Sequence, residues 1–347
     1  MITFAAADDA AARADWARLL QDFPAARVHA DARWLDVVGR AYGARGSFAF
    51  ERDVSGAVQT TLAGYESRTL RGWPTFHSLR HGLLSRGDWP TDALIDAVGQ
   101  TCRARGCIEA VVGGGLQPPP GPYRASTRFA VGLDLAAGSQ PLWEGFRDKV
   151  RNTIRKAERG GLTVSRDPAH LQAFHAIHAR AMTERHGRVR ALSFFRTLLS
   201  VFGDDARLYS ALDGNSVCGA MVVIVTGGHA TYPFGAFDEQ ARRLGANSLL
   251  LWHVARDLAG DGVRELDLGP SAQGSGAYRF KIHMGGTPQS LHYIDLLQPA
   301  RPPIADTAGE RAASARPLGR LDRAIECLPL PLRIQARTWL GRKGRLL

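Results

Sequence analysis

Basic side chains are concentrated at residues 147–161, where they could bind an anion. Arginines recur there at intervals of four residues: Arg147, Arg151, Arg155 and Arg159. On a helix, like charges at this spacing repel each other, and a bound anion would offset the repulsion. The guanidinium group suits a phosphate because it can donate two parallel hydrogen bonds. We therefore predict an anion site, with a solvated basic face as the alternative. Its residues are Arg151, Asn152, Arg155 and Lys156.

A second candidate site lies at residues 242–248, which follow a predicted strand and open a predicted helix. Backbone amides at a helix N-terminus can hold a pyrophosphate. The run is similar to the [RQ]-x-x-G-x-[GA] turn with which GNAT-type acetyltransferases bind coenzyme A, although Asn247 replaces the final Gly or Ala. The alternative is an ordinary helix start that Asn247 or Ser248 caps. The residues predicted to contact the donor are Arg242, Gly245, Asn247 and Ser248.

A third candidate site joins a strand end to a glycine-rich loop and a short helix, over residues 267–281. Ligands often bind at strand ends in α/β proteins. A lysine placed there could bind a phosphate or stabilise an oxyanion. A mobile surface loop is the alternative. The candidate residues of this segment are Asp267, Tyr278 and Lys281, together with Arg279 and Phe280, which are predicted to bind the substrate or its anion.

The elements that must position these sites follow from hydrophobic periodicity and from turn residues. The first half is predicted to begin with helical material, followed by strands at 47–52, 57–64 and 76–84, a helix from Thr91 to about Arg105 and a strand at 107–112. In the second half, helices are predicted at about 140–159, 168–185, 191–202, 245–259 and 276–283. Strands are predicted there at 129–135, 206–212, 217–226, 229–236, 263–268 and 290–297.

Two segments of the chain echo one another. Residues 106–113 and 262–269 both follow a predicted helix, and both consist of a glycine, a short strand and a second glycine. Each also comes after three predicted strands, which indicates the duplication of one α/β unit. We therefore expect one domain at 1–137 and another at 138–300, with a linker and a basic tail at 301–347. Residues 117–122, which are rich in proline, are predicted to form the loop that ends the first half.

Composition limits the class of protein and its partners. The net charge of +11 favours phosphate-bearing substrates, nucleic acid or an anionic membrane surface, unless arginine-rich coding alone explains it. The cysteines have no zinc-binding spacing, and we expect no metal and free thiols in a reducing cytoplasm. We find no signal peptide and no stretch of 18 apolar residues, so we expect a cytoplasmic protein, with the inner face of the membrane as an alternative location.

The tail is predicted to dock on an anionic membrane. Leu318, Leu321 and Ile325 recur at helical spacing, prolines interrupt the pattern, and a second segment carries Trp339. Tryptophan and leucine beside a basic cluster suit the membrane interface. The basic residues are Arg333, Arg337, Arg342, Lys343 and Arg345. The alternative is that the leucines pack on the protein while the arginines stay solvated.

At these segments the chain resembles the FemAB family, whose members carry tandem GNAT-like domains. It is most similar to the branch encoded beside exosortase and exopolysaccharide systems. The resemblance rests on the basic run at 149–161, the helix at 245–252, the segment from Asp267-Leu268-Gly269 to Phe280-Lys281, and the Leu-Pro-Leu-Pro run at 328–331. Leu268 departs from the aromatic residue common in the family, and His283-Met284 replaces its usual polar-Trp step.

The resemblance implies an α/β (α+β) fold of two tandem GNAT-like acyltransferase domains with mixed, mostly antiparallel sheets. It also implies an acyl- or aminoacyltransferase that forms an amide on an amine, in cell-envelope or exopolysaccharide metabolism. The donor would be acyl-CoA, an acyl carrier or aminoacyl-tRNA, with no tightly bound cofactor. Lys281 would stabilise developing negative charge, and Tyr278 and Asp267 would position the amine. A non-catalytic protein that binds anionic polysaccharide or membrane is the alternative.

Overall fold

The computed structural model describes residues 1–115, 122–299 and 320–341. The chain forms two compact units. The N-terminal unit comprises Met1–Arg128, Ser290–Gly309 and Arg342–Leu347, and the C-terminal unit comprises Phe129–Gln289 and Glu310–Gly341. The expected domain limits at 137 and 300 stay predictions. The proline-rich loop at 117–121 and the linker at 302–316 lie outside the described residues.

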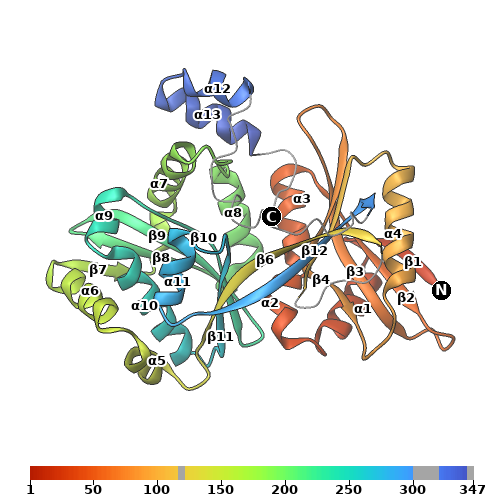
Figure 1. Ribbon diagram of the computed structural model, residues 1–347, viewed down its shortest axis with the longest axis horizontal. Coiled ribbons are helices and arrows are strands. Elements are labelled where there is room, and N and C mark those ends of the chain that lie inside the picture. The colour runs from red at the N-terminus through yellow and green to blue at the C-terminus, as the bar shows by residue number, and fades with distance from the viewer. Residues whose placement is uncertain (116–121, 300–319, 342–347) are drawn as a thin grey trace. The chain divides into compact units, whose positions relative to one another are not determined.

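The N-terminal unit is a sheet with strand order β1-β2-β3-β4-β5-β12 (Figure 1). Its strands are β1 (Ile2–Ala6), β2 (Arg45–Arg52), β3 (Val58–Arg68), β4 (Pro74–Ser85), β5 (Glu109–Gly115) and the end of β12 (Thr287–Pro299). Its α-helices are α1 (Ala10–Leu20), α2 (Arg27–Ala30), α3 (Arg33–Tyr42) and α4 (Asp92–Ala104). The apolar face of α4 packs on the sheet through Leu94, Ile95 and Val98. The purely helical start that we predicted is wrong, because β1 precedes α1.

The C-terminal unit has the strand order β6-β11-β10-β9-β8-β7. Its strands are β6 (Tyr123–Asp134), β7 (Leu162–Ser165), β8 (Ala206–Asp213), β9 (Ser216–Thr226), β10 (His229–Phe237) and β11 (Glu265–Ser271). Its α-helices before the tail are α5 (Ser139–Gly145), α6 (Asp148–Arg159), α7 (Leu171–Glu184), α8 (Leu192–Phe202), α9 (Glu239–Arg243), α10 (Ala246–Gly260) and α11 (Gly276–His283). Helices α6 and α10 cover one face of this sheet, and α7 and α8 cover the other (Figure 1). Sequence reasoning missed β7 and α9.

The two units repeat the same strand pattern. In each, three antiparallel strands lead through a helix to a strand that pairs in parallel with the third, β4 with β5 and β10 with β11. The echoing segments 106–113 and 262–269 run into β5 and β11 respectively. The fold is therefore the expected pair of tandem α/β units with mixed, mostly antiparallel sheets.

The single helix predicted at 140–159 is two helices. Phe146 and Arg147 have extended backbones, with ψ of 140° and 147°, and they separate α5 from α6. The buried ring of Phe146 packs against Trp252 of α10, which holds the break in place. Arg147 therefore lies outside α6, and the predicted line of arginines on one helix is reduced to Arg151, Arg155 and Arg159.

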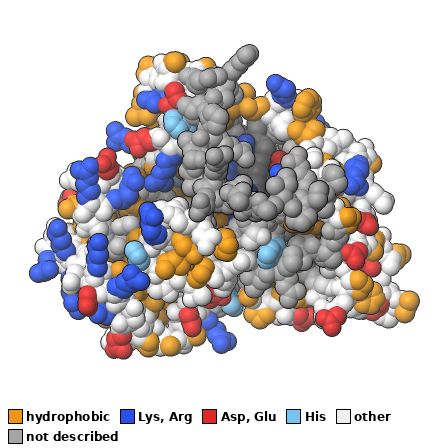
Figure 2. Space-filling model, viewed as in Figure 1, with side chains coloured by type: hydrophobic (Ala, Val, Ile, Leu, Met, Phe, Trp, Pro, Cys, Tyr) orange, Lys and Arg blue, Asp and Glu red, His pale blue; other side chains and the backbone are white. Residues whose placement is uncertain are grey.

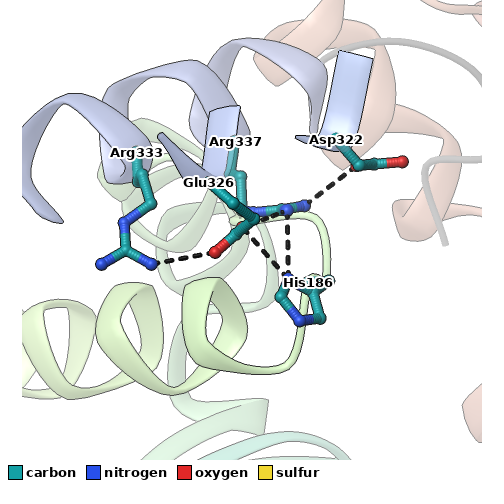
Figure 3. A network of polar contacts seen from close by, with 5 residues as sticks. All are labelled: His186, Asp322, Glu326, Arg333 and Arg337. Carbon is teal, nitrogen blue, oxygen red and sulfur yellow. Dashed lines mark hydrogen bonds and ion pairs between the residues drawn. The ribbon is translucent and has the colours of Figure 1, made fainter. Parts of the chain in front are cut away.

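The tail forms two helices, α12 (Arg320–Glu326) and α13 (Leu330–Leu340), which belong to the C-terminal unit. The side chain of Arg337 is only 2% exposed, and its guanidinium lies 2.7 Å from the carboxylate of Glu326. Figure 3 shows that the same carboxylate also pairs with Arg333 at 2.9 Å and with His186, which follows α7, at 3.0 Å. Our expectation that Arg337 is free to meet a membrane is wrong, because Arg337 anchors the tail internally.

Ion pairing sets the stability of this docked tail. The Arg337 guanidinium, and less strongly His186 and Arg333, lower the pKa of Glu326 from its ordinary value to about 2. Because the folded pKa lies below the unfolded one, the stabilisation is complete above about pH 5 and is lost as the pH falls toward 2.

Among the described residues, no helix is both long and apolar enough to cross a bilayer.

We predict that Glu326→Gln loosens the tail at pH 7. The substitution removes the nearest carboxylate of the buried Arg337, which keeps the longer pair to Asp322 at 3.4 Å and the contact with His186 at 3.5 Å. Removing one partner of a buried pair costs about 3–5 kcal/mol. Hydrogen exchange of the α13 amides should therefore become much faster.

Glu184→Gln is the matched control, since Glu184 forms an exposed pair with Arg180 on α7. Such pairs contribute about 0–1 kcal/mol, so α13 exchange should hardly change in this variant. Equal exchange rates for α13 in the wild-type protein and in Glu326→Gln would contradict the assignment.

Candidate functional site

The two parallel strands of the C-terminal unit part after a short stretch of pairing. β10 and β11 are paired at only three positions, His229 with Glu265, Ala230 with Leu266, and Thr231 with Asp267. Beyond these, β10 has a bulge between Thr231 and Phe234, and β11 shifts register against β6 between Asp267 and Pro270. Such irregularities disrupt a ladder locally and turn its backbone groups away from their former partners. A site of this kind can bind an extended ligand through the backbone.

The N-terminal unit has the same short pairing but a different continuation. There β4 and β5 pair at three positions that end with His77 and Val111. The hydroxyl of Ser78 then accepts a hydrogen bond at 3.0 Å from the amide of Gly113, which ties the two strands together. At the corresponding position of β11, the amide of Gly269 donates instead to the carboxylate of Asp267 in its own strand, at 2.7 Å. The amide of Gly113 therefore links β5 to β4, whereas the corresponding amide of Gly269 does not link β11 to β10.

Lys281 lies at this point of the C-terminal unit, on α11. Its ammonium donates hydrogen bonds to the carbonyl of Gly269 at 2.9 Å and to the hydroxyl of Ser271 at 2.7 Å, with the carbonyl of Pro270 at 3.5 Å. The residue is only 9% exposed. The ammonium of Lys281 thus holds the last three residues of β11.

The other residues predicted around Lys281 divide into buried and exposed ones. Asp267 is buried, and Tyr278 and Phe280 are half-buried against the core of the unit. Arg279 is exposed, and its guanidinium bonds the carbonyl of Gly274 at 2.9 Å. The hydroxyl of Ser275 accepts a hydrogen bond from the Tyr278 amide at 3.1 Å and so caps α11.

Tyr232 is a candidate that sequence reasoning missed. It lies in the β10 bulge, next to the last paired residue Thr231. Burial raises the pKa of its phenol, which therefore stays protonated. A Cβ at Gly235 would lie 1.9 Å from the Tyr232 hydroxyl, so only glycine at 235 leaves room for this side chain. The Tyr-Pro pair within a predicted strand was the available signal, because proline removes a ladder donor.

The predicted donor turn, residues 242–248, packs against α6 at Gly245. Gly245, with φ of 86°, is the residue that precedes α10, and neither Asn247 nor Ser248 caps the helix. A Cβ at Gly245 would lie 2.6 Å from the Thr153 methyl group of α6, so a side chain would push the two helices apart. Asn247 is half-buried and Ser248 is buried, whereas Arg242 is exposed. The first amides of any helix lack intrahelical partners, and they attract anions.

The charged residues of α6 lie on two different faces. Lys149 and Lys156 are exposed and lie four residues before and three residues after Thr153, so they share its face beside the Gly245 turn. Arg155 and Arg151 lie on the opposite face. Sequence reasoning named Lys156 as an anion-binding residue but did not name Lys149. The spacing of four residues between Lys149 and Thr153 could have indicated that they share a helix face.

The two arginines have partners at α5. The Arg151 guanidinium bonds the carbonyl of Glu144 at 2.8 Å and the carboxylate of Asp148 at 2.5 Å. Arg155 is exposed and lies over the Trp143 ring, 5.5 Å from its centroid. Asn152 is also exposed.

Figure 2 shows Lys and Arg side chains gathered over the part of the unit that α6 and α9 form. Within the described residues, no His, Cys, Asp or Glu side chains cluster as metal ligands would.

We predict that Lys281→Met destabilises the protein. The variant keeps the apolar stem but removes the hydrogen bonds to Gly269 and Ser271, and unsatisfied buried groups cost about 1–3 kcal/mol. Urea unfolding should show a loss in this range. Arg279→Met, on the same helix but exposed, should change stability by less than about 0.5 kcal/mol. Equal stabilities for the two variants would contradict the role assigned to Lys281.

The sequence of the chain matches a known protein family over part of its length. Residues 144–281 match the family model described as an acetyltransferase (GNAT) domain. No curated protein matches the chain in sequence.

Among solved structures, the chain is similar to FemX, with a TM-score of 0.59, 13% identity, and coverage of 79% of this chain and 95% of FemX. It is also similar to a tandem GNAT protein from the clavulanic acid biosynthesis pathway, with a TM-score of 0.53, 15% identity, and coverage of 85% and 99%. The similarity to L-PGS from Bacillus licheniformis has a TM-score of 0.50 at 12% identity, with coverage of 82% and 91%. Residues 144–281 thus match a GNAT acetyltransferase domain, and the fold of the chain is similar to the folds of FemX and of the tandem GNAT protein.

Proposed function

We propose that this protein transfers an acyl or aminoacyl group from an activated donor to an amine acceptor, in cell-envelope or exopolysaccharide metabolism. The observation that carries the proposal is the parting of β10 from β11 inside the GNAT domain. An extended donor can lie along backbone groups that no longer pair with each other. Comparable pairing in the N-terminal unit is tied by Ser78 and Gly113, which supports the C-terminal unit as the site of transfer.

The proposed reaction is an attack by the amine nitrogen on the donor's carbonyl carbon. A C–N bond forms, and the C–S bond of a thioester or the C–O bond of an aminoacyl ester breaks. The nitrogen loses a proton and the leaving sulfur or oxygen gains one. Asp267 and Tyr278 would position the amine, and the Lys281 ammonium would raise the positive potential near the developing oxyanion. Proximity and electrostatics would supply most of the rate enhancement.

The donor's phosphate would bind at the start of α10. The helix amides, Asn247 and Ser248 would face the anion, with Arg242, Lys149 and Lys156 around it. Asn152, Arg155 and Arg159 would form a second basic surface that only a longer anion, such as tRNA, would reach. In this proposal Arg151 supports α5, because its guanidinium is already bonded there.

A non-catalytic protein that binds anionic polysaccharide or membrane is the rival function. The bonds of Lys281 to protein oxygens favour it, because a lysine held in this way can serve a purely structural role. Incubation with amine acceptors and acyl-CoA, acyl carrier or aminoacyl-tRNA donors distinguishes the two. Amide formation with any donor supports the enzyme, whereas tight binding of an anionic polymer without turnover supports the rival.

We predict that the two basic faces of α6 respond differently to substitution. Lys149→Gln with Lys156→Gln should raise the KM for any phosphate-bearing donor by about threefold to tenfold and flatten its salt dependence, since each exposed ionic contact contributes up to about 1 kcal/mol. Arg155→Gln with Arg159→Gln should raise the KM for a tRNA donor only. No change in KM or in salt dependence for either pair would contradict the proposed donor site.

We further propose that the tail contacts an anionic membrane. Leu332 and Trp339 on α13 are 46% and 56% exposed, and Leu328 just before it is 37% exposed, while Ile325 is buried in the protein. Exposed tryptophan and leucine on a helix that basic residues follow in the sequence suit a membrane interface. In this proposal Arg337 and Glu326 hold one side of the tail to the protein, and the other side, with Leu332 and Trp339, is left for lipid.

A liposome experiment tests this contact. Trp339→Ser with Leu332→Ser should reduce co-sedimentation with vesicles that contain anionic phosphatidylglycerol, and neutral vesicles should sediment little protein in either case. Gln335→Ser, an exposed polar position on the same helix, is the control. Equal sedimentation of all three proteins would contradict a membrane role for α13.

A further inference from the structure

The N-terminal unit contains a cavity that the transfer reaction does not use. Its volume is about 550 Å³, and it lies between α4 and the strands β1 to β4. It is lined at the start of β4 by Pro74 and Phe76 and at the end of α4 by Thr101 and Arg105. A volume of this size is typical of small-molecule sites.

The interior of the cavity is mainly apolar. Leu62 and Phe76 of the sheet and Val98 of α4 line it, and all three side chains are buried. Small residues, among them Ala5 and Ala49, leave the space between helix and sheet unfilled. Well-packed cores rarely contain voids much larger than a water molecule. The cavity therefore suits an apolar guest.

The rim of the cavity carries a positive charge. Arg45, Arg68 and Arg105 line it together with a single carboxylate, that of Glu66. Glu66 is 11% exposed and pairs with Arg45 at 3.1 Å and with Arg105 at 3.3 Å, whereas those two arginines are 74% and 58% exposed. The paired carboxylate offsets one cation, and the rim keeps an excess of positive charge toward solvent.

We propose that this cavity binds a single-chain amphiphile with an anionic head group. The chain would lie against Leu62, Phe76 and Val98, and the head group would lie at Arg45 and Arg68. Apolar burial supplies affinity in proportion to chain length, and the arginines select the sign of the head group. This binding site is independent of the proposed transfer reaction.

Calorimetry with the full-length protein and dodecyl compounds tests the proposal. Dodecanoate and dodecyl phosphate should both bind, and dodecylammonium should bind at least about tenfold more weakly. Octanoate should bind more than tenfold more weakly than dodecanoate, because each methylene removed costs about fourfold in affinity. Binding of dodecanoate alone would assign the site to carboxylates, and stronger binding of dodecyl phosphate would assign it to phosphate heads. Equal binding of the cationic compound, or no binding of either anion, would overturn the proposal.

Two variants locate the binding. Thr101→Trp should fill the cavity and abolish dodecanoate binding, whereas Gln100→Trp, one residue away on the exposed side of α4, should not. Arg45→Gln with Arg68→Gln leaves Glu66 paired with Arg105 and should weaken dodecanoate binding by about threefold to tenfold. Arg40→Gln, an exposed arginine of α3 outside the cavity, should have no effect. Wild-type affinity in both cavity variants would place the ligand elsewhere and overturn the proposal.

Discussion

The short parallel pairing of β10 with β11 is the constraint on which the site of the C-terminal unit depends. The strands pair at three positions, the last of which joins Thr231 to Asp267, and beyond it the strands part. Longer pairing would satisfy the backbone groups that the proposed donor needs. Shorter pairing would leave no rigid support for the end of β11, which carries Gly269. The geometry of the proposed site is therefore set by where β10 and β11 stop pairing.

The surrounding residues keep this interruption stable. Asp267 binds the amide of Gly269, and Lys281 binds its carbonyl, so both backbone groups of the glycine are satisfied without a neighbouring strand. A buried lysine is costly unless its charge is well hydrogen-bonded, which Ser271 and the backbone carbonyls provide. The N-terminal unit meets the same need with the hydroxyl of Ser78. The same strand pattern thus has two continuations: Ser78 ties the strands together in the N-terminal unit, and Asp267 and Lys281 hold Gly269 in the C-terminal unit.

Sequence patterns predicted the order of elements along the chain and most element positions, because apolar periodicity is a local signal. The duplication was visible in the glycines that flank 106–113 and 262–269. The break at Phe146 was not, because the ring that holds it packs against Trp252, about 100 residues away in the chain. Burial of Lys281 was likewise hidden, since its acceptors are mainly backbone carbonyls with no sequence signature.

The tail illustrates the same limit. The helical spacing and the prolines of the tail are local features of the sequence, and the observed helices α12 and α13 agree with them. The burial of Arg337 depends on Glu326 and on His186, which lies on another element, so composition alone assigned that arginine to solvent. The sequence could show which residue types were present near each site, but not which of their polar groups were already bonded.

Hydrogen exchange of the full chain with a bound donor tests the central claim most directly. The donor would be the one that supports amide formation in the transfer assay, compared with the free protein under identical conditions. We expect slower exchange of the amides around the β10 bulge, of Gly269 to Ser271, and of the first turn of α10. Slower exchange confined to the N-terminal unit, with the β10 bulge and Gly269 to Ser271 of β11 unchanged, would contradict the account.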